Sequence, residues 1–511
     1  METDKITSSY RKSIGNTQKV VDVVLQKEDE NSISKILSST ANAYVEDIEM
    51  LNGEAHFVGG VVFNCLYVDN QGKNHILSDK VDINDKLDNP VLNPLMKSIC
   101  KVEIVEIKTE NVDDDRVKLT ASVELSFDVI VTDEVNQIRA DNNSLQTLKE
   151  PINQYSVVAN GDKTFTVAEQ YDSKLKVERV LMSTAHTVLK NITSGTGYFT
   201  VEGEVFVNSV LEVATEEGTE LKNFMQTLPF KEEIEDENVQ KEDLIYAFAY
   251  SKPQDVVVEY SAMDAEQANN TLNVSVVVTI RYIALRMTEQ EIYTDIFSTT
   301  NKTNLVTDSF SVTKSTRQET FKTSIEGQAT IGDDEPRIAK ICAVSGEHLT
   351  IANYGVVDGE LTIEGIAYAT VIYLTDDDVP AKNSMDLEVP FSVKFNVSEI
   401  SSQDMFVVGH IVDIDVKARK GKEINTMFDL VFTVDCYETE NQVLVKEVEL
   451  TEELVPRDYS LAIYLAPKGS TLWDVSKHLL VSEEVLLNQN PDVIFPLETN
   501  QNIVYFKQRV Q

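Results

Sequence analysis

The sequence predicts a mainly β protein in which three repeated antiparallel β domains, each a sandwich or an open barrel, precede a small domain of the order β-α-α-β. Three observations predict this fold class. A glycine-containing phrase recurs three times, apolar and polar residues alternate in long segments, and the pattern changes near the C-terminus. The 511 residues are enough for three or four domains of ordinary size.

The recurring phrase consists of a glycine, five residues and a second glycine. It reads GEAHFVG from Gly53, GYFTVEG from Gly197 and GELTIEG from Gly359. An apolar cluster begins 20, 20 and 21 residues earlier, respectively, and these clusters are Ile33–Leu37, Val177–Leu181 and Ile338–Cys342. A fixed offset that occurs three times indicates three copies of one domain. The copies are predicted at residues 8–135, 155–285 and 310–440.

Each copy is predicted to contain a first hairpin that begins with the glycine strand. Polar turns at residues 69–72, 216–218 and 376–378 separate this strand from a returning strand. In the second and third copies the returning strand contains Pro229 and Pro390. Because proline cannot donate a ladder hydrogen bond, these strands are expected at sheet edges.

A second hairpin closes each copy. Its strands are predicted at Val102–Thr109 and Val117–Val129, at Val256–Met263 and Leu272–Ala284, and at Ile411–Ala418 and Met427–Tyr437. Apolar residues occupy alternate positions of the returning strands, as at Leu272, Val274 and Val276. This period of two predicts one buried face and a firmly specified register.

The segments between the copies, residues 134–148 and 289–301, are polar enough to hold short helices. Both contain an Asp and a Ser three positions apart, Asp141 with Ser144 and Asp295 with Ser298, and Asp458–Ser460 is a shortened version. Such residues usually cap a helix or a turn. The acidic segment Lys231–Asp243 is expected to be a solvated loop or helix face.

Charge and cysteine content exclude several classes of function. The net charge of −40 repels phosphate backbones and anionic lipids, so nucleic acid and membrane surfaces are not expected partners. The four cysteines are far apart and form no CxxC pair, which favours buried thiols over disulfides or metal ligands. No apolar run is long enough to span a bilayer, and the first residues lack the apolar region of a signal peptide. We therefore expect a cytoplasmic protein.

Motifs of catalysis are missing from the sequence. It contains no GxxxxGK[ST], HExxH, GxSxG or GxGxxG motif. The six histidines are isolated in the sequence, and a lone histidine is more often structural than catalytic. The acidic turns Asp113–Asp115 and Asp376–Asp378 could supply oxygen ligands to calcium, but neither belongs to a full ligand loop. We expect no enzymatic activity, no cofactor and no metal site.

Residues 460–509 form the predicted β-α-α-β domain. Leu461–Leu465 and Ile503–Phe506 are the expected strands. Ser470 is expected to cap a helix at Thr471–His478, and Ser482 a second helix at Glu483–Asn488, which Asn490-Pro491 ends.

The segment APKGSTLWDVSKHLLVSEEVLLNQNPDV resembles a LysM domain. The resemblance rests on Gly469, Thr471, Leu472, Trp473, Val481, Ser482, Leu486, Leu487, Asn490 and Pro491. Ser470 stands where the family usually has Asp, and residues 499–506 lack the usual closing Gly and Pro. The resemblance implies two binding loops, which consist of Gly469, Ser470 and Thr471, and of Pro491, Asp492, Val493 and Ile494. It also implies that Trp473, the sole tryptophan, faces the core and is not a sugar platform.

Repeated β domains followed by one LysM domain resemble the SPOCS–LysM proteins of spore-forming Firmicutes. This resemblance implies a non-enzymatic scaffold for spore coat or envelope assembly, located in the mother-cell cytosol at the forespore surface. It implies that the LysM domain binds a protein partner, a coat ATPase of the SpoIVA type. The alternative is a cell-wall protein that binds peptidoglycan or N-acetylglucosamine, and the expected lack of an export signal argues against it. A hydrolase of wall polymers would need a catalytic constellation that the sequence does not show.

Overall fold

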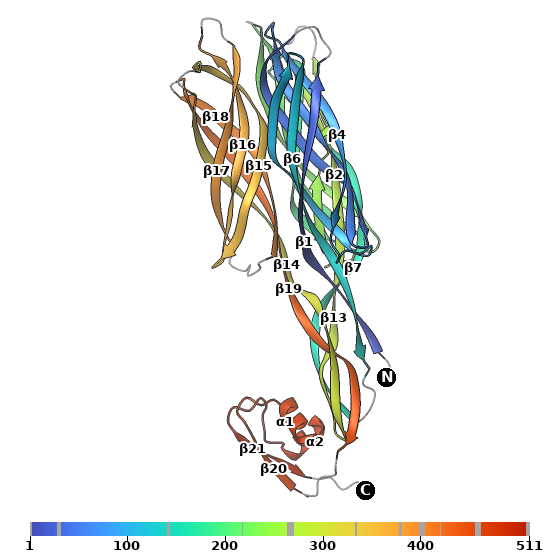
Figure 1. The fold of residues 1–511 in the computed structure, drawn as a ribbon. Helices are drawn as coiled ribbons and strands as arrows, with labels where there is room; N and C mark the ends of the chain where they lie inside the picture. Colours follow the sequence, from blue (N-terminus) through green and yellow to red (C-terminus); the bar gives the residue numbers. More distant parts are fainter. Residues whose placement is uncertain are drawn as a thin grey trace.

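The computed structural model describes residues 3–27, 32–139, 144–216, 218–262, 270–332, 335–377, 381–397, 404–419, 421–454 and 461–506. These residues form antiparallel β-strands almost throughout, with two short α-helices close to the C-terminal end (Figure 1). The predicted mainly β class is confirmed.

The strands fall into three sets of similar order, which we call repeats 1, 2 and 3. Repeat 1 contains β1 (Thr3–Gln26), β2 (Ile33–Leu51), β3 (Glu54–Asp69), β4 (Asn74–Asp88), β5 (Lys97–Asp113) and β6 (Arg116–Ile138). Repeat 2 contains β7 (Leu145–Ser173), β8 (Val177–Ser194), β9 (Tyr198–Thr215), β10 (Gly218–Glu235), β11 (Leu244–Tyr250), a 3-10 turn (Pro253–Asp255), β12 (Val256–Ala262) and β13 (Asn270–Ser298). Repeat 3 contains β14 (Asn301–Thr330), β15 (Ile338–Val357), β16 (Glu360–Thr375), β17 (Lys382–Asn396), β18 (Asp404–Arg419) and β19 (Glu423–Glu453).

Each repeat is a sandwich of two antiparallel sheets. In repeat 1 the sheets have the orders β2-β3-β4 and β1-β6-β5, and repeat 3 has the same arrangement in β15-β16-β17 and β14-β19-β18. Repeat 2 pairs the sheet β8-β9-β10 with a sheet in which β13 contacts β7, β11 and β12. The two sheets of each repeat share one apolar core, as Phe63 of β3 and Leu125 of β6 do in repeat 1.

The predicted hairpins and their register are confirmed. In β13, Leu272, Val274 and Val276 are fully buried, whereas Val277 on the other face is half-buried. The prolines Pro229 and Pro390 lie in β10 and β17, which are edge strands of their sheets. Of the predicted turns, residues 217, 263–269, 378 and 420 lie outside the described residues.

The structure explains both glycines of the recurring phrase. The first lies in the turn before the glycine strand with a positive φ, as Gly53 (80°), Gly197 (84°) and Gly359 (76°) do. The second is approached by the neighbouring strand. A Cβ on Gly59, Gly203 or Gly365 would lie 2.1, 2.4 or 2.2 Å from the carbonyl oxygen of Tyr44, Val188 or Thr350, respectively. A β-bulge in the neighbouring strand faces each of these second glycines. The phrase therefore marks one backbone geometry that is used three times.

The prediction of short helices between the repeats is wrong. Residues 134–138 continue β6, residues 145–148 begin β7, and residues 289–298 end β13. Apolar side chains from all three repeats, including Ile152, Ile292 and Leu444, pack together here and favour strands. Of the two Asp and Ser pairs, Asp141 lies outside the described residues, as does Asp458–Ser460. Ser298 caps a turn as expected, because its Oγ accepts the N–H groups of Thr300 and Asn301 at 3.2 Å.

These strand extensions form a stalk below the sandwiches (Figure 1). We define the stalk as residues 3–8, 132–138, 145–155, 287–298, 301–312 and 440–453, which pair as three long antiparallel ribbons. The acidic segment 231–243 is also partly a strand, because β10 extends to Glu235 before a turn begins. Asp243 is buried in that turn and is ion-paired with Arg286 at 2.9 Å.

The three repeats pack against one another around a common line. The apolar clusters that precede the glycine phrase meet there, with Leu37, Leu181 and Cys342 in one buried group. A second group joins Ile130 of repeat 1, Ile283 of repeat 2 and Phe406 of repeat 3. Three copies of one domain thus build a single body with contacts between all pairs of repeats.

A buried arginine lies where the three repeats meet. Arg11 is 2% exposed and its guanidinium is paired with Asp128 at 2.8 Å and with Asp435 at 3.5 Å. The hydroxyl of Tyr437 donates to Asp128 at 3.1 Å. The guanidinium carbon also lies 5.6 Å from the ring centre of Tyr246 in repeat 2. Arg11 of repeat 1 is therefore in contact with Tyr246 of repeat 2 and with Asp435 of repeat 3.

The C-terminal unit lies at the far end of the stalk (Figure 1). It consists of β20 (Leu461–Ala466), α1 (Leu472–Leu479), α2 (Glu483–Gln489) and β21 (Gln501–Phe506), in the predicted order. Its core contains Ala466, Val475, Leu479, Val481, Leu486, Leu497 and Ile503. In the part of the chain that the structure describes, no helix has the length and apolar character needed to cross a membrane.

Candidate functional site

The two loops that the LysM resemblance assigns to binding lie next to each other. The backbone N–H of Gly469 donates to the carbonyl of Leu497 at 2.8 Å, and the N–H of Leu497 donates to the carbonyl of Ser470 at 3.0 Å. The chain just after Ile494 is thereby joined to the loop that precedes α1. The first loop is thus bonded to the segment that follows the second loop.

The predicted N-cap of the first helix is wrong by one residue. The cap is Thr471, not Ser470, and α1 begins at Leu472. Thr471 Oγ1 accepts the N–H of Asp474 at 3.1 Å, while the Asp474 carboxylate accepts the Thr471 N–H at 2.9 Å. This reciprocal capping box is more stable than a cap without a returning acceptor. The hydroxyl of Thr471 is therefore engaged within the helix start.

The second helix begins at Glu483 as predicted and ends at Gln489, one residue after the predicted end. Ser482 Oγ accepts the N–H of Val485 at 3.3 Å, and Asn490 is the C-cap. The amide of Asn490 then donates to the carbonyl of Val504 at 2.7 Å and accepts its N–H at 2.8 Å. Asn490 thus joins α2 to β21 and fixes where the second loop begins.

The second loop divides into packed and exposed side chains. Val493 and Phe495 pack against the core of the unit, whereas Ile494 between them is 83% exposed. Pro491 and Asp492 are exposed as well. Ile494 is therefore the apolar side chain of this loop that is open to a partner.

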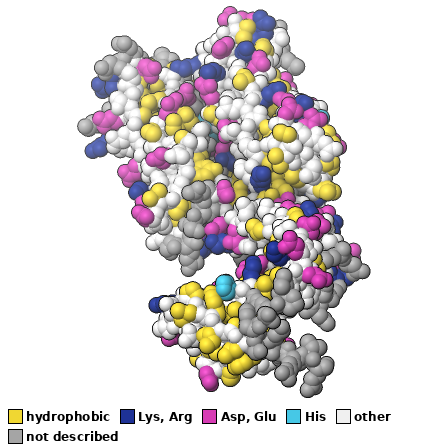
Figure 2. Space-filling view, turned by 60° about the horizontal axis from the view of Figure 1, so that its bottom comes forward, with side chains coloured by type: hydrophobic (Ala, Val, Ile, Leu, Met, Phe, Trp, Pro, Cys, Tyr) yellow, Lys and Arg dark blue, Asp and Glu magenta, His cyan; other side chains and the backbone are white. Residues whose placement is uncertain are grey.

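A larger apolar surface lies on the two-stranded sheet. Leu461, Ile463 and Leu465 alternate along β20 and are 48%, 64% and 60% exposed, because α1 and α2 cover the opposite face. Phe506 of β21 pairs with Leu461 and is 48% exposed. Figure 2 shows hydrophobic side chains over much of the visible surface of the C-terminal unit. Sequence reasoning missed this surface, although its signal was present as alternating large aliphatics in a two-stranded sheet.

Trp473 is buried, but it packs outside the core of the C-terminal unit. Its ring lies 5.0 Å from that of Phe297 in β13, and its indole N–H donates to Asp295 at 2.9 Å. Trp473 is buried as expected, at 6% exposure, but the expectation that it faces the core of its own unit is wrong. The stalk, and not the unit's own core, provides the packing.

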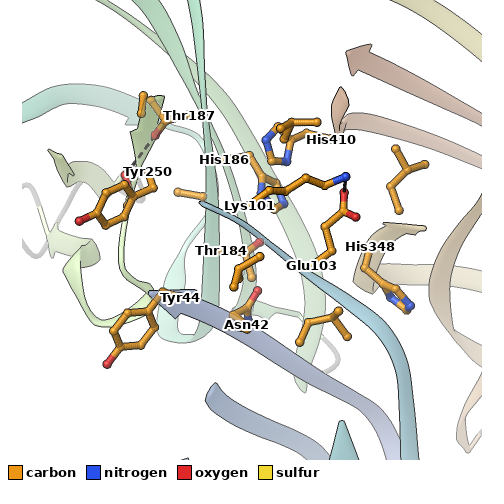
Figure 3. Close-up of a pocket in the computed structure, with 18 of the residues that line it drawn as sticks. Asn42, Tyr44, Lys101, Glu103, Thr184, His186, Thr187, Tyr250, His348 and His410 are labelled. Atoms are coloured by element: carbon orange, nitrogen blue, oxygen red, sulfur yellow. Dashed lines mark hydrogen bonds and ion pairs between the residues drawn. The ribbon is translucent and has the colours of Figure 1, made fainter. Parts of the chain in front are cut away.

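A second candidate site is a cavity of about 270 Å³ where the three repeats meet (Figure 3). Its walls are β2 and β5 of repeat 1, β8 and β11 of repeat 2, and β15 and β18 of repeat 3. Figure 3 shows Asn42, Lys101, His186 and His410 around it, with Tyr44 and Tyr250 at one side. Histidines that are isolated in the sequence are thus brought to one place by the repeat packing.

The histidines of the cavity are neutral near pH 7. The rings of His186 and His410 are stacked with their centres 4.8 Å apart. Burial lowers the pKa of His186 to about 4. Burial also lowers the pKa of His410 well below its usual value, and the nearby His186 and Lys101 lower it further. His348 is held apart from this pair by stacking on Tyr368 with a centre distance of 4.4 Å.

The charged groups of the cavity are already paired or hydrogen-bonded. Lys101 Nζ lies 2.7 Å from Glu103 and donates to the carbonyl of Val407 at 2.7 Å. Burial raises the pKa of Glu347, while hydrogen bonds from Asn208 at 2.7 Å and Thr184 at 3.0 Å oppose that rise. The bond from Lys101 to the Val407 carbonyl joins repeat 1 to repeat 3, and the bonds to Glu347 join repeat 2 to repeat 3.

The described groups around the cavity do not form a nucleophile and base pair. The hydroxyls of Ser183 and Thr187 bond to Ser209 and Ser251, and not to a histidine. Burial raises the pKa of the Cys100 thiol to about 12, so this thiol is not a thiolate near pH 7. Among the described residues, no three His, Cys, Asp or Glu side chains are arranged to hold a metal ion. In the turn Asp113–Asp115, Asp113 is bonded to Arg116 instead.

The comparison with family models finds a match in two of the three repeats. The model described as the SPOCS domain of SipL matches residues 32–127 and 337–419. These matches cover the equivalent parts of repeats 1 and 3, from the apolar-cluster strand into the second hairpin. Repeats 1 and 3 therefore each contain a segment that is similar to a SPOCS domain. This similarity to the SPOCS domain of SipL suggests a sporulation-related coat function. Comparisons with curated proteins and with solved structures find no match.

Proposed function

We propose that this protein is a non-enzymatic scaffold for spore coat assembly. In this proposal the C-terminal unit is a LysM domain that binds a protein partner, a coat ATPase of the SpoIVA type, at the forespore surface in the mother-cell cytosol. The SPOCS match supports the sporulation role. The β-α-α-β order and the place of the motif residues at caps and core positions support the LysM assignment.

The observation that carries the docking proposal is the exposed apolar surface of the C-terminal unit. Leu461, Ile463 and Leu465 form one face of the sheet, and Ile494 extends from the second loop. Contiguous exposed apolar surface is typical of protein interfaces, in which a few buried anchors provide most of the affinity. The rest of the chain carries a large negative charge, whereas this face is formed by uncharged side chains. A partner can therefore bury it without desolvating charges.

The proposal is tested with Ile463→Asp and Ile494→Asp in the full chain. Both side chains are more than half exposed, so the folded unit should tolerate the changes, whereas Val493 packs against the core and would test folding as well as binding. Each variant should lose recovery of the coat ATPase in a pull-down and should no longer localise to the forespore as a fluorescent fusion. Val357→Asp, at a 72% exposed position of repeat 3, is the matched control and should bind normally.

A glycan-binding function would give a different result. If the protein binds N-acetylglucosamine oligomers at micromolar concentration, and Asp492→Ala abolishes that binding, the wall-binding alternative replaces this proposal. Partner recovery that is unchanged in Ile463→Asp and Ile494→Asp would also contradict it.

A further inference from the structure

The face of α1 that carries Trp473 and Lys477 is in contact with the tip of the stalk. The indole N–H of Trp473 donates to Asp295 Oδ2 at 2.9 Å, and Lys477 Nζ lies 2.5 Å from the same oxygen. The Trp473 ring also packs on Phe297 with a centre distance of 5.0 Å and an interplanar angle of 60°. The Asp295 carboxylate of β13 thus accepts from both Trp473 and Lys477 of α1, and the Phe297 ring of β13 packs on the Trp473 ring.

Local structure positions both sides of this contact. The register of β13 and β7 shifts between Tyr293 and Asp295, which is a β-bulge at Thr294. After the bulge, strand alternation directs Asp295 and Phe297 to the C-terminal unit and the fully buried Ile296 to the stalk core. On α1, Trp473 and Lys477 are four residues apart and therefore lie on one face of the helix.

Burial shows that this contact is close. Trp473 is 6% exposed and Phe297 is 1% exposed, although both lie at the ends of their parts of the molecule. A buried indole N–H requires an acceptor, and Asp295 provides it. The Lys477 ammonium balances the charge of that carboxylate, so the contact contains no uncompensated ion.

We infer that the α1 face is an interaction surface whose partner is the tip of this chain's own stalk. Asp295 and Phe297 hold the C-terminal unit in one orientation and make Trp473 inaccessible to any other ligand. The exposed face of β20, with Ile463, and the side chain of Ile494 remain outside this contact. The unit therefore has two separate surfaces, one for the stalk and one that is free. This inference rests on contacts within the chain and does not depend on the proposed partner.

The sole tryptophan makes the inference directly testable, because the intrinsic fluorescence of the full-length protein reports the environment of Trp473. Asp295→Lys places a cation opposite Lys477 and removes the indole acceptor. The emission should shift to longer wavelength, and acrylamide quenching should increase severalfold. Asp308→Lys is the matched control, since Asp308 is also a stalk aspartate paired with a lysine, Lys446 at 3.0 Å, and it should leave the emission unchanged.

A charge-reversed double variant provides a second test in the same fluorescence assay. Asp295→Lys combined with Lys477→Asp restores the ion pair with opposite orientation and should recover much of the protection from acrylamide. Asp295→Asn keeps an oxygen acceptor for the indole but loses the charge, and should give an intermediate value. Unchanged emission and quenching in Asp295→Lys, with far-ultraviolet circular dichroism like the wild type, would overturn the inference.

Discussion

Replacement of Arg11 is expected to be among the most destabilising single substitutions outside the apolar cores. In the wild type the guanidinium nitrogens of Arg11 lie 2.8 Å from Asp128 and 3.5 Å from Asp435. Arg11→Met leaves both carboxylates buried without this cation. Removal of one partner of a buried ion pair costs about 3–5 kcal/mol, because an uncompensated charge remains in an apolar region. Lost contact with the rings of Tyr246 and Tyr437 adds to this cost.

The assay is urea unfolding followed by far-ultraviolet circular dichroism, with Lys12→Met as the matched control. Lys12 is the next residue of β1 but is exposed, so its replacement should change the free energy of unfolding by no more than about 0.5 kcal/mol. Arg11→Met combined with Asp128→Asn and Asp435→Asn should recover part of the loss, because it removes the charges that were left unpaired.

The pH dependence of Arg11→Met gives an independent check. Burial raises the pKa of Asp435, and the Arg11 charge opposes that rise. Without Arg11 the pKa of Asp435 rises further, so the native variant takes up this proton at a higher pH than the unfolded chain does. Its deficit relative to the wild type should therefore shrink as the pH falls from 7 to 5. A deficit no larger than that of Lys12→Met, or one that grows on acidification, would refute this account of the buried cluster.

Three further predictions concern the repeats. Val276→Asp should destabilise repeat 2 by several kcal/mol and unfold it, whereas Val277→Asp on the half-buried face should be far less destabilising. Thermal unfolding followed by circular dichroism measures both variants. Equal losses of stability would contradict the strand register. Gly203→Ala should be more destabilising than Gly197→Ala in urea unfolding. The first change forces a Cβ to 2.4 Å from a backbone oxygen, whereas the second adds only the strain of a positive φ. A larger loss of stability in Gly197→Ala would be inconsistent with the bulge. The pKa of His186 is depressed to about 4, so the unfolded chain takes up its proton first and native stability falls as the pH drops below the usual histidine value. His186→Gln should therefore lose less stability than the wild type between pH 7 and 5, by at most about 2 kcal/mol. Identical pH profiles of the two proteins would contradict this.

Much of the repeat architecture could be predicted because local signals and burial agree. The glycine phrase is repeated because a positive φ and a close backbone approach both exclude a side chain. The alternation of apolar and polar residues at Leu272–Ile280 predicts a strand with one fully buried face, and the structure has such a strand. These signals are contained within single elements and do not depend on distant residues.

The stalk could not be predicted for the opposite reason. Residues 134–138 and 289–298 are polar overall, and their apolar residues are buried only because strands of the other repeats lie beside them. The same holds for the cavity, where His186 and His410 come from different repeats. Asp295 was interpreted as a capping residue, but its Oδ2 binds Trp473 and Lys477, which are 178 and 182 positions away in the C-terminal unit. Tertiary contacts over such separations leave no local pattern.

The C-terminal unit shows how close a motif-based prediction can come. Its strands and helices were expected within a few residues of their observed bounds, and Ser482 caps α2 as predicted. The first cap moved from Ser470 to Thr471 because Asp474 completes a capping box with Thr471. The exposed face of β20 was missed, because the alternation of Leu461, Ile463 and Leu465 in the sequence does not show which face of the strand the helices cover.

Isothermal titration calorimetry of the full-length protein with the purified coat ATPase tests most directly whether the C-terminal unit binds this partner. We expect saturable binding that Ile463→Asp weakens by a large factor and that Val357→Asp leaves unchanged. Ile463 lies on the free apolar face of the C-terminal unit, whereas Val357 lies on the exposed end of β15. We also expect no heat with N-acetylglucosamine oligomers. Equal affinity of the wild type and Ile463→Asp for the coat ATPase, or saturable heat with the oligomers, would contradict this proposal.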